Sequence, residues 1–282
     1  MRSARNSPRA RRAWRRIVLA LASLLAVSQS VAAGLIVSLE GDFIQGGLVR
    51  GRVAPDAGVS LDGERVRVAR DGRFVIGFGR DAAARFVLRA VAPDGLAEER
   101  VLAVEQRTYE VERINNLDAD KVNPPPHAFR RIRDERRLIA QARRRALDHA
   151  DCFGGFLWPL KNRITGVYGS TRILNGEPRS PHYGVDIASP EGAVVRAPAG
   201  GVVTLIHDMY FSGKTLVLDH GYGVSSTFLH LHKALVGDGE RVEQGAPIAE
   251  VGATGRVTGP HLDWRVNWLG RRLDPQLLAG PM

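Results

Sequence analysis

Short β-rich runs separated by glycine turns occupy most of this sequence and limit what it can fold into. Six such runs lie between residues 34 and 112, at 35–39, 48–53, 65–68, 73–78, 86–91 and 101–104. The Asp-Gly pairs at 62–63, 71–72 and 94–95 suit the positive φ angles of tight hairpins. We therefore predict a small antiparallel β-sandwich over 34–112. It contains no histidine or cysteine, so we interpret it as an accessory positioning or binding module.

The next segment, 113–150, combines a linker with an arginine-rich helix. The linker ends in Pro124-Pro125-Pro126, which cannot continue a helix. Apolar residues then recur at helical spacing among arginines, and residues 127–150 carry eight arginines against three acidic residues. The segment either packs one apolar stripe on a neighbouring domain, or contacts an anionic polymer or membrane surface.

From residue 151 to 282 the chain is again rich in glycine and short β runs, which predicts a second, antiparallel β domain. Runs at 202–206, 215–218, 226–231, 247–251 and 262–266 are the expected strands. Seven of the eight histidines lie between residues 149 and 261. This second domain is therefore where chemistry is expected.

The net charge of +10 invites a nucleic-acid interpretation, but the location of the charge argues against it. Residues 1–16 contain seven arginines and no acid, followed by an apolar run at 17–27 and small residues up to Ala33. These are the parts of a secretory signal, so we expect residues 1–33 to direct export to the periplasm or cell envelope. Without them, 33 basic residues face 30 acidic ones, and no general basic field remains for nucleic acid.

Three groups of histidine and aspartate in the second domain could converge on a metal. The first is His182 with Asp186, and the last is His261 with Asp263. Between them, His230 and His232 are expected on one face of a strand, because side chains alternate along it. Any one of these groups alone more often has a structural role than a metal-binding one, but the three together predict a metal site.

The sequence from about 165 to 275 resembles the lysostaphin-type (LytM-like) zinc metallopeptidases, which cut peptide cross-links in bacterial peptidoglycan. The resemblance is carried by several ordered motifs: Val167-Tyr-Gly-Ser-Thr-Arg172, His182-Tyr-Gly-Val-Asp186, Phe228-Leu-His-Leu231, Gly252 through Leu262, and Leu273-Asp-Pro275. It implies an antiparallel β catalytic domain with an open groove, zinc as the cofactor and peptidoglycan as the partner. Oligomeric state is left open.

The resemblance also implies roles for individual residues. His182 and Asp186 match the first two metal ligands, and His230 and His261 match the two catalytic histidines. One of these histidines would take a proton from a metal-bound water while the other stabilises the oxyanion; which does which stays open. Where the family has a third histidine ligand, this sequence has Asp263.

Aspartate at position 263 changes the net charge and the donor atoms of the expected metal site. Two anionic ligands make a zinc site formally neutral, which should acidify its water less. The harder oxygen donors also make Mn²⁺ or Fe²⁺ conceivable, although zinc is expected. Three arrangements remain open: Asp263 is the third ligand, His232 replaces it, or the site is inactive.

Two functions follow from these alternatives. The first is an exported, metal-dependent endopeptidase acting on peptidoglycan cross-links. The second is a catalytically degenerate relative that binds peptidoglycan or activates another cell-wall hydrolase. A lipoyl-like carrier fold is disfavoured, because no lysine occupies a suitable hairpin tip and the histidine and aspartate groups would be unexplained.

Overall fold

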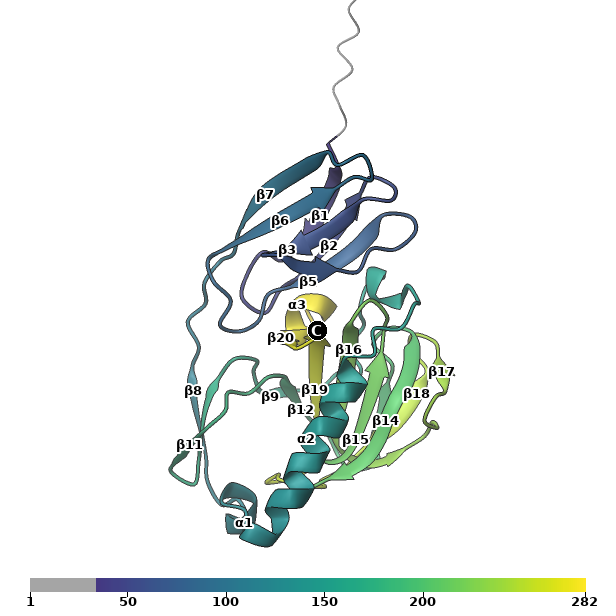
Figure 1. Cartoon of the computed structure of the whole chain (residues 1–282). Helices are drawn as coiled ribbons and strands as arrows, with labels where there is room; N and C mark the ends of the chain where they lie inside the picture. The colour runs from purple at the N-terminus through teal and green to yellow at the C-terminus, as the bar shows by residue number, and fades with distance from the viewer. Residues whose placement is uncertain (1–33) are drawn as a thin grey trace, which may run out of the picture. The chain divides into compact units, whose positions relative to one another are not determined.

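The computed structural model describes residues 34–282, whose secondary structure is mainly β (Figure 1). The expected export signal at 1–33 lies outside the described residues. No helix between residues 34 and 282 is long and apolar enough to cross a membrane.

The N-terminal part is the predicted antiparallel sandwich. Its strands are β1 (Ile36–Gly41), β2 (Leu48–Val53), β3 (Gly58–Leu61), β4 (Glu64–Val66), β5 (Arg73–Gly77), β6 (Arg85–Val91) and β7 (Ala97–Ala103). They form a sheet of order β1-β2-β5 and a second of order β4-β3-β6-β7. Strand β6 alternates exposed and buried residues along its length, as expected of a strand with one face on a core.

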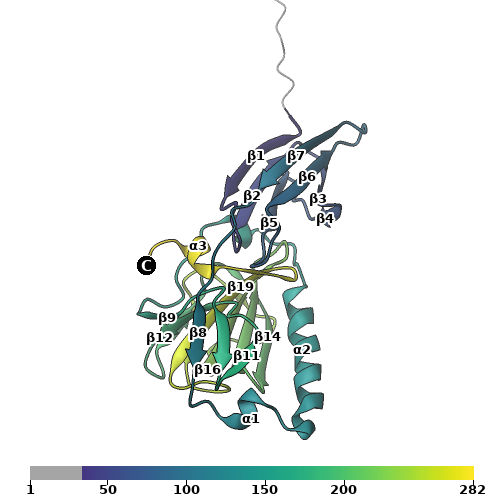
Figure 2. The same ribbon diagram turned by 90° about the vertical axis from the view of Figure 1, so that its left-hand side faces the viewer.

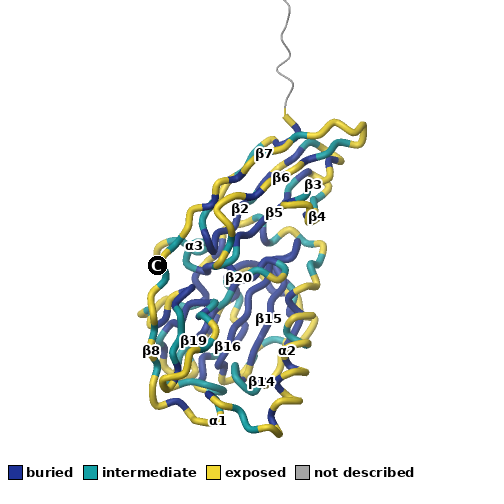
Figure 3. Tube along the Cα trace, turned by 60° about the vertical axis from the view of Figure 1, so that its left-hand side comes forward, coloured by how far each residue is buried: buried dark blue, intermediate teal, exposed yellow. Residues whose placement is uncertain are grey.

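The C-terminal part is built on one large sheet, whose main path runs β17-β14-β15-β16-β19-β12-β9. Its strands are β9 (Ile164–Gly166), β12 (Val185–Ala188), β13 (Val194–Arg196), β14 (Gly201–Met209), β15 (Gly213–Asp219), β16 (Val224–Ala234), β17 (Arg241–Val242), β18 (Pro247–Val251), β19 (His261–Trp268) and β20 (Arg271–Leu273). All pairs within it are antiparallel, and β15 and β16 are largely buried (Figure 3). The fold class predicted from the sequence is confirmed.

A small fourth sheet contains a parallel strand pair. Strand β8 (Val111–Ile114) pairs in parallel with β10 (Thr171–Leu174), which pairs with β11 (Glu177–Arg179). The segment predicted as a plain linker therefore begins in a strand, and it also contains the short helix α1 (Ala119–Val122). Sequence pattern missed this because two short strands far apart in the chain form the pair.

The arginine-rich segment forms α2 (Phe129–Arg143), preceded by the 3₁₀ turn η1 (Pro126–Ala128). Leu138, Ile139 and Ala142 of α2 pack on Leu205 and the neighbouring core of β14 and β15. Figure 2 shows α2 at the side of the sheet away from β9 and β12. The remaining helical turns are η2 (Asp151–Phe153) and α3 (Pro275–Ala279).

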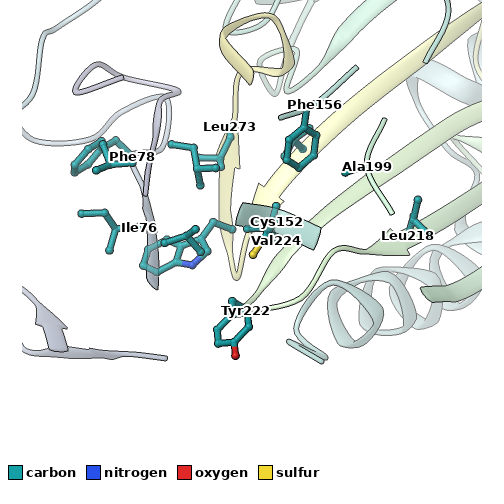
Figure 4. Close-up of a cluster of buried hydrophobic side chains, with 14 of the residues drawn as sticks. Ile76, Phe78, Cys152, Phe156, Ala199, Leu218, Tyr222, Val224 and Leu273 are labelled. Atoms are coloured by element: carbon teal, nitrogen blue, oxygen red, sulfur yellow. The ribbon is translucent and has the colours of Figure 1, made fainter. Parts of the chain in front are cut away.

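One hydrophobic core continues from the sandwich into the large sheet (Figure 4). Ile76 and Phe78 of the sandwich belong to the same buried cluster as Leu273 of β20. Gly77 lies between them, and a Cβ there would come 2.9 Å from a methyl carbon of Leu273. Gly77 thus permits a close approach that a side chain would block.

Candidate metal centre

The pairing of β12 with β19 positions the two aspartates. Asp186 lies directly opposite Asp263, and Ala188 lies opposite His261. Because opposed residues and residues two apart on a strand share a face, Asp186, Asp263 and His261 lie on one face of the sheet. Because His261 and Asp263 are two residues apart on β19, both side chains thus lie next to Asp186 of β12.

His182 completes a tight cluster with these aspartates. Its Nε2 lies 3.1 Å from Asp186 Oδ1 and 3.5 Å from Asp263 Oδ2. The three residues are buried, and each offers one ligand atom within 4.8 Å of the others. His182 Nδ1 donates to the carbonyl of Val167 at 3.2 Å, which leaves Nε2 as the ligand atom.

The cluster has the chemistry of a divalent-metal site. His182 Nε2 and Asp186 Oδ1 are buried and lie 3.1 Å apart, yet neither makes a hydrogen bond of acceptable geometry with the other or with any other described residue, although buried polar atoms are normally paired. One imidazole nitrogen and two carboxylate oxygens suit zinc, and three protein ligands leave a coordination position open. The residues present therefore fit the metal that the sequence predicted.

Two arginines hold the aspartates from behind. Arg172 Nη2 donates to Asp186 Oδ2 at 2.6 Å, and Arg265 Nε donates to Asp263 Oδ1 at 2.9 Å. A second nitrogen of Arg265 pairs with Asp263 Oδ2, so this contact is bidentate. Burial alone would raise the pKa of Asp263, but Arg265 and His182 outweigh it and hold the pKa well below its usual range.

The pKa of His182 is affected by the same balance. Burial disfavours the imidazolium, but the carboxylates of Asp186 and Asp263 outweigh burial and raise the pKa. The cluster thus attracts positive charge to the position of His182 Nε2. A divalent cation would satisfy that attraction directly.

His230 and His261 lie together beside the cluster. Their ring centroids are 4.9 Å apart, and His261 Nε2 is 3.8 Å from Asp186 Oδ1. Each Nδ1 donates to a backbone carbonyl, that of Thr254 for His230 and that of Gly259 for His261. Both rings thereby leave Nε2 free for proton transfer or hydrogen bonding. Burial, followed by the nearby His261, lowers the pKa of His230 to about 4.

His232 does not join this arrangement. The sequence placed it on the same face as His230, but His230 has a φ of 63° and the β16–β18 register shifts between Leu231 and Lys233. This irregularity breaks the alternation on which the expectation relied. His232 is about half exposed and its Nδ1 lies 2.7 Å from Glu191 Oε1, so its ring is not among the converging ligand atoms.

Two clefts open beside the cluster. One, of about 300 Å³, is lined by Asp186 and His261; the other, of about 700 Å³, lies under α2. His230, Arg172 and Arg256 line both clefts. The smaller cleft therefore reaches the cluster at Asp186, and the larger one reaches His230 beside it.

Comparison with known protein families decides what kind of domain carries this cluster. Residues 180–275 match the model of Peptidase family M23. The chain contains a peptidase M23 domain. The match includes His182, Asp186, His230, His261 and Asp263, so all the residues singled out from the sequence lie within the M23 domain.

Two curated relatives that match this part of the chain have names that refer to peptidoglycan or to the hydrolysis of murein. Peptidoglycan DD-endopeptidase ShyB of Vibrio cholerae is 42% identical over 94 residues, 33% of this chain and 22% of the relative. Murein hydrolase activator EnvC of Escherichia coli is 34% identical over 127 residues, 45% of this chain and 29% of the relative. The chain thus spans roughly a quarter of the length of these relatives.

A solved structure resembles nearly the whole described chain. A Pseudomonas aeruginosa protein whose crystal structure is assigned to peptidase M23 aligns with a TM-score of 0.67 and 29% sequence identity. The alignment covers 85% of this chain and 96% of that one. The similarity therefore extends beyond the M23 domain to the sandwich and α2.

Sequence reasoning gave no role to three residues that shape the site. Arg172 and Arg265 hold the aspartates, and Gly184 leaves room for them, since a Cβ there would lie 2.6 Å from Asp263 Oδ1. The position of Arg265, two residues after Asp263 on one strand, was the available signal for the pair. Arg172 gave no such signal, because it comes from a different sheet.

Proposed function

We propose that this protein is a metal-dependent endopeptidase that hydrolyses peptide cross-links of bacterial peptidoglycan. The observation that carries the proposal is the convergence of His182, Asp186 and Asp263, with two unpaired buried ligand atoms, beside His230 and His261 in an M23 domain. The names of the curated relatives support peptidoglycan as the substrate.

The three ligand residues would hold zinc, in preference to Mn²⁺ or Fe²⁺. When bound, such an ion polarises the scissile carbonyl and makes water a stronger nucleophile near neutral pH. His230, which its low pKa keeps neutral, can accept a proton at Nε2. His261, nearer to Asp186 and to solvent, donates its Nδ1 proton to Gly259, so in its imidazolium form it can also donate a hydrogen bond from Nε2 to the developing oxyanion.

Export is part of the proposal, because peptidoglycan lies outside the cytoplasm. The basic and apolar composition of residues 1–33 supports it. The protein would then act in the periplasm or cell envelope.

Digestion of purified peptidoglycan tests the proposal. The zinc-loaded protein should release soluble peptides, EDTA should stop the release, and added zinc should restore it. His230→Gln and His261→Gln should each lower the rate by about 100-fold or more, while the His207→Gln control should not. Absence of metal-dependent release would instead favour a protein that binds peptidoglycan or activates another hydrolase, as EnvC is named.

A further inference from the structure

The larger cleft has an unusual charge. Of its lining residues seven are arginines and only Glu135 is acidic; besides Arg265, these arginines are Arg133, Arg136, Arg143, Arg172, Arg179 and Arg256. Glu135 does not neutralise them, since its two oxygens accept from Arg131 Nε and the Tyr210 backbone, outside this lining. Four of the seven arginines have a carboxylate within salt-bridge distance: Arg133, Arg172, Arg179 and Arg265. The positive charge that stays uncompensated among the described residues is that of Arg136, Arg143 and Arg256.

Arg143 is the most informative of these residues. Its side chain is buried, with 6% of the residue exposed, and its Nε donates a hydrogen bond to Thr227 Oγ1 at 3.1 Å. No carboxylate of residues 34–282 lies within salt-bridge distance of it, and the same holds for Arg136 and Arg256. A buried cation without an anionic partner is costly, which points to a partner supplied from outside.

The arginines also repel one another. Burial, followed by the charges of Arg172 and Arg265, lowers the pKa of Arg256 to about 10, so Arg256 stays cationic near neutral pH. Burial and the charges of Arg272 and Arg265 likewise lower the pKa of Arg143. An anion in the cleft would relieve this repulsion.

We propose that this cleft, the arginine cleft, binds free carboxylates of the stem peptide while the neighbouring metal centre acts on the cross-link. The inference rests on the proposed function for the identity of the peptide. The geometry favours carboxylates because planar guanidiniums pair with them in a bidentate way. Phe129, Ile132 and Ile139 line the same cleft, which suits a peptide that carries methyl groups between its carboxylates. His230 lines both clefts, so the bound carboxylates lie next to the reacting bond.

Binding of uncross-linked muropeptides tests the proposal without requiring cleavage, because these molecules lack the cross-link. Isothermal titration calorimetry of the zinc-loaded protein compares the natural muropeptide with the same material amidated at its carboxyl groups. Amidation should weaken binding about tenfold or more. Arg136→Gln and Arg256→Gln should each weaken binding of the natural form about tenfold and leave the amidated form unchanged.

Arg137→Gln is the matched control, since Arg137 lies on α2 but not in the cleft. Equal binding of the natural and amidated forms, or variants that behave like the control, would overturn the proposal. This failure is separable from failure of the proposed function. If the protein cleaves peptidoglycan but binds natural and amidated muropeptides equally, only the carboxylate-binding role of the arginine cleft is refuted. If binding depends on the carboxylates but no cleavage occurs, that role stands and the proposed peptidase activity is refuted.

Discussion

Asp263 and Arg265 form an ion pair, and we expect that replacing Asp263 alone destabilises the protein more than replacing both residues. The substitution Asp263→His leaves Arg265 without its carboxylate, although only 21% of that side chain is exposed. Breaking a buried pair from one side costs about 3–5 kcal/mol, and partial exposure of Arg265 sets the expected loss near the lower end. We therefore expect Asp263→His to lower the free energy of unfolding by about 3 kcal/mol.

The double variant Asp263→His with Arg265→Gln should recover most of this loss, because no unpaired charge remains. It should also bind zinc more tightly than Asp263→His alone, because the cation next to the ligand is gone. Urea unfolding in EDTA measures the first effect, and zinc titration against a chelator measures the second. If Asp263→His alone is as stable as the wild type, or if adding Arg265→Gln to Asp263→His changes nothing, the pairing argument is wrong.

Three further changes probe the site and its support. Gly184→Ala should displace Asp263 and weaken zinc binding by more than about tenfold, whereas unchanged affinity would show that Asp263 is not a ligand. Leu273→Ala should lower the free energy of unfolding in urea by about 2–5 kcal/mol, and a loss under about 1 kcal/mol would contradict the shared core. Burial lowers the pKa of His220 to about 4, so the unfolded chain binds the proton first and stability falls as the pH drops from about 6.5 to about 4. His220→Gln should reduce the loss between pH 7 and pH 5, measured by urea unfolding, by about 2 kcal/mol, and an unchanged pH dependence would refute the assignment.

Much of this protein could be predicted because its signals are local. Hairpin turns such as Asp71-Gly72 fix neighbouring strands, and the spacing of His261 and Asp263 puts both side chains on one face. The strand pairing β8–β10 could not be predicted, since it joins short segments about 60 residues apart. The face of His232 was misjudged because a single positive φ at His230 interrupts the alternation.

The charge of the site was also beyond sequence reasoning. With two aspartate ligands the metal site was expected to be formally neutral. Arg172 and Arg265 pair with those aspartates, so the region regains positive charge from outside the ligand set. The positive charge of Arg265 offsets the negative charge that Asp263 adds to the site. A less acidified water therefore no longer follows from the presence of the second aspartate.

The metal content of the purified protein tests the central claim most directly. Elemental analysis after dialysis against a trace of zinc should find one zinc per chain in the wild type and in the Glu191→Gln control, which lies beside His232. His182→Ala should contain less than about a tenth of that amount, because it removes the imidazole ligand. Zinc-free wild type, or full zinc in His182→Ala, would contradict the metal centre on which the proposed function depends.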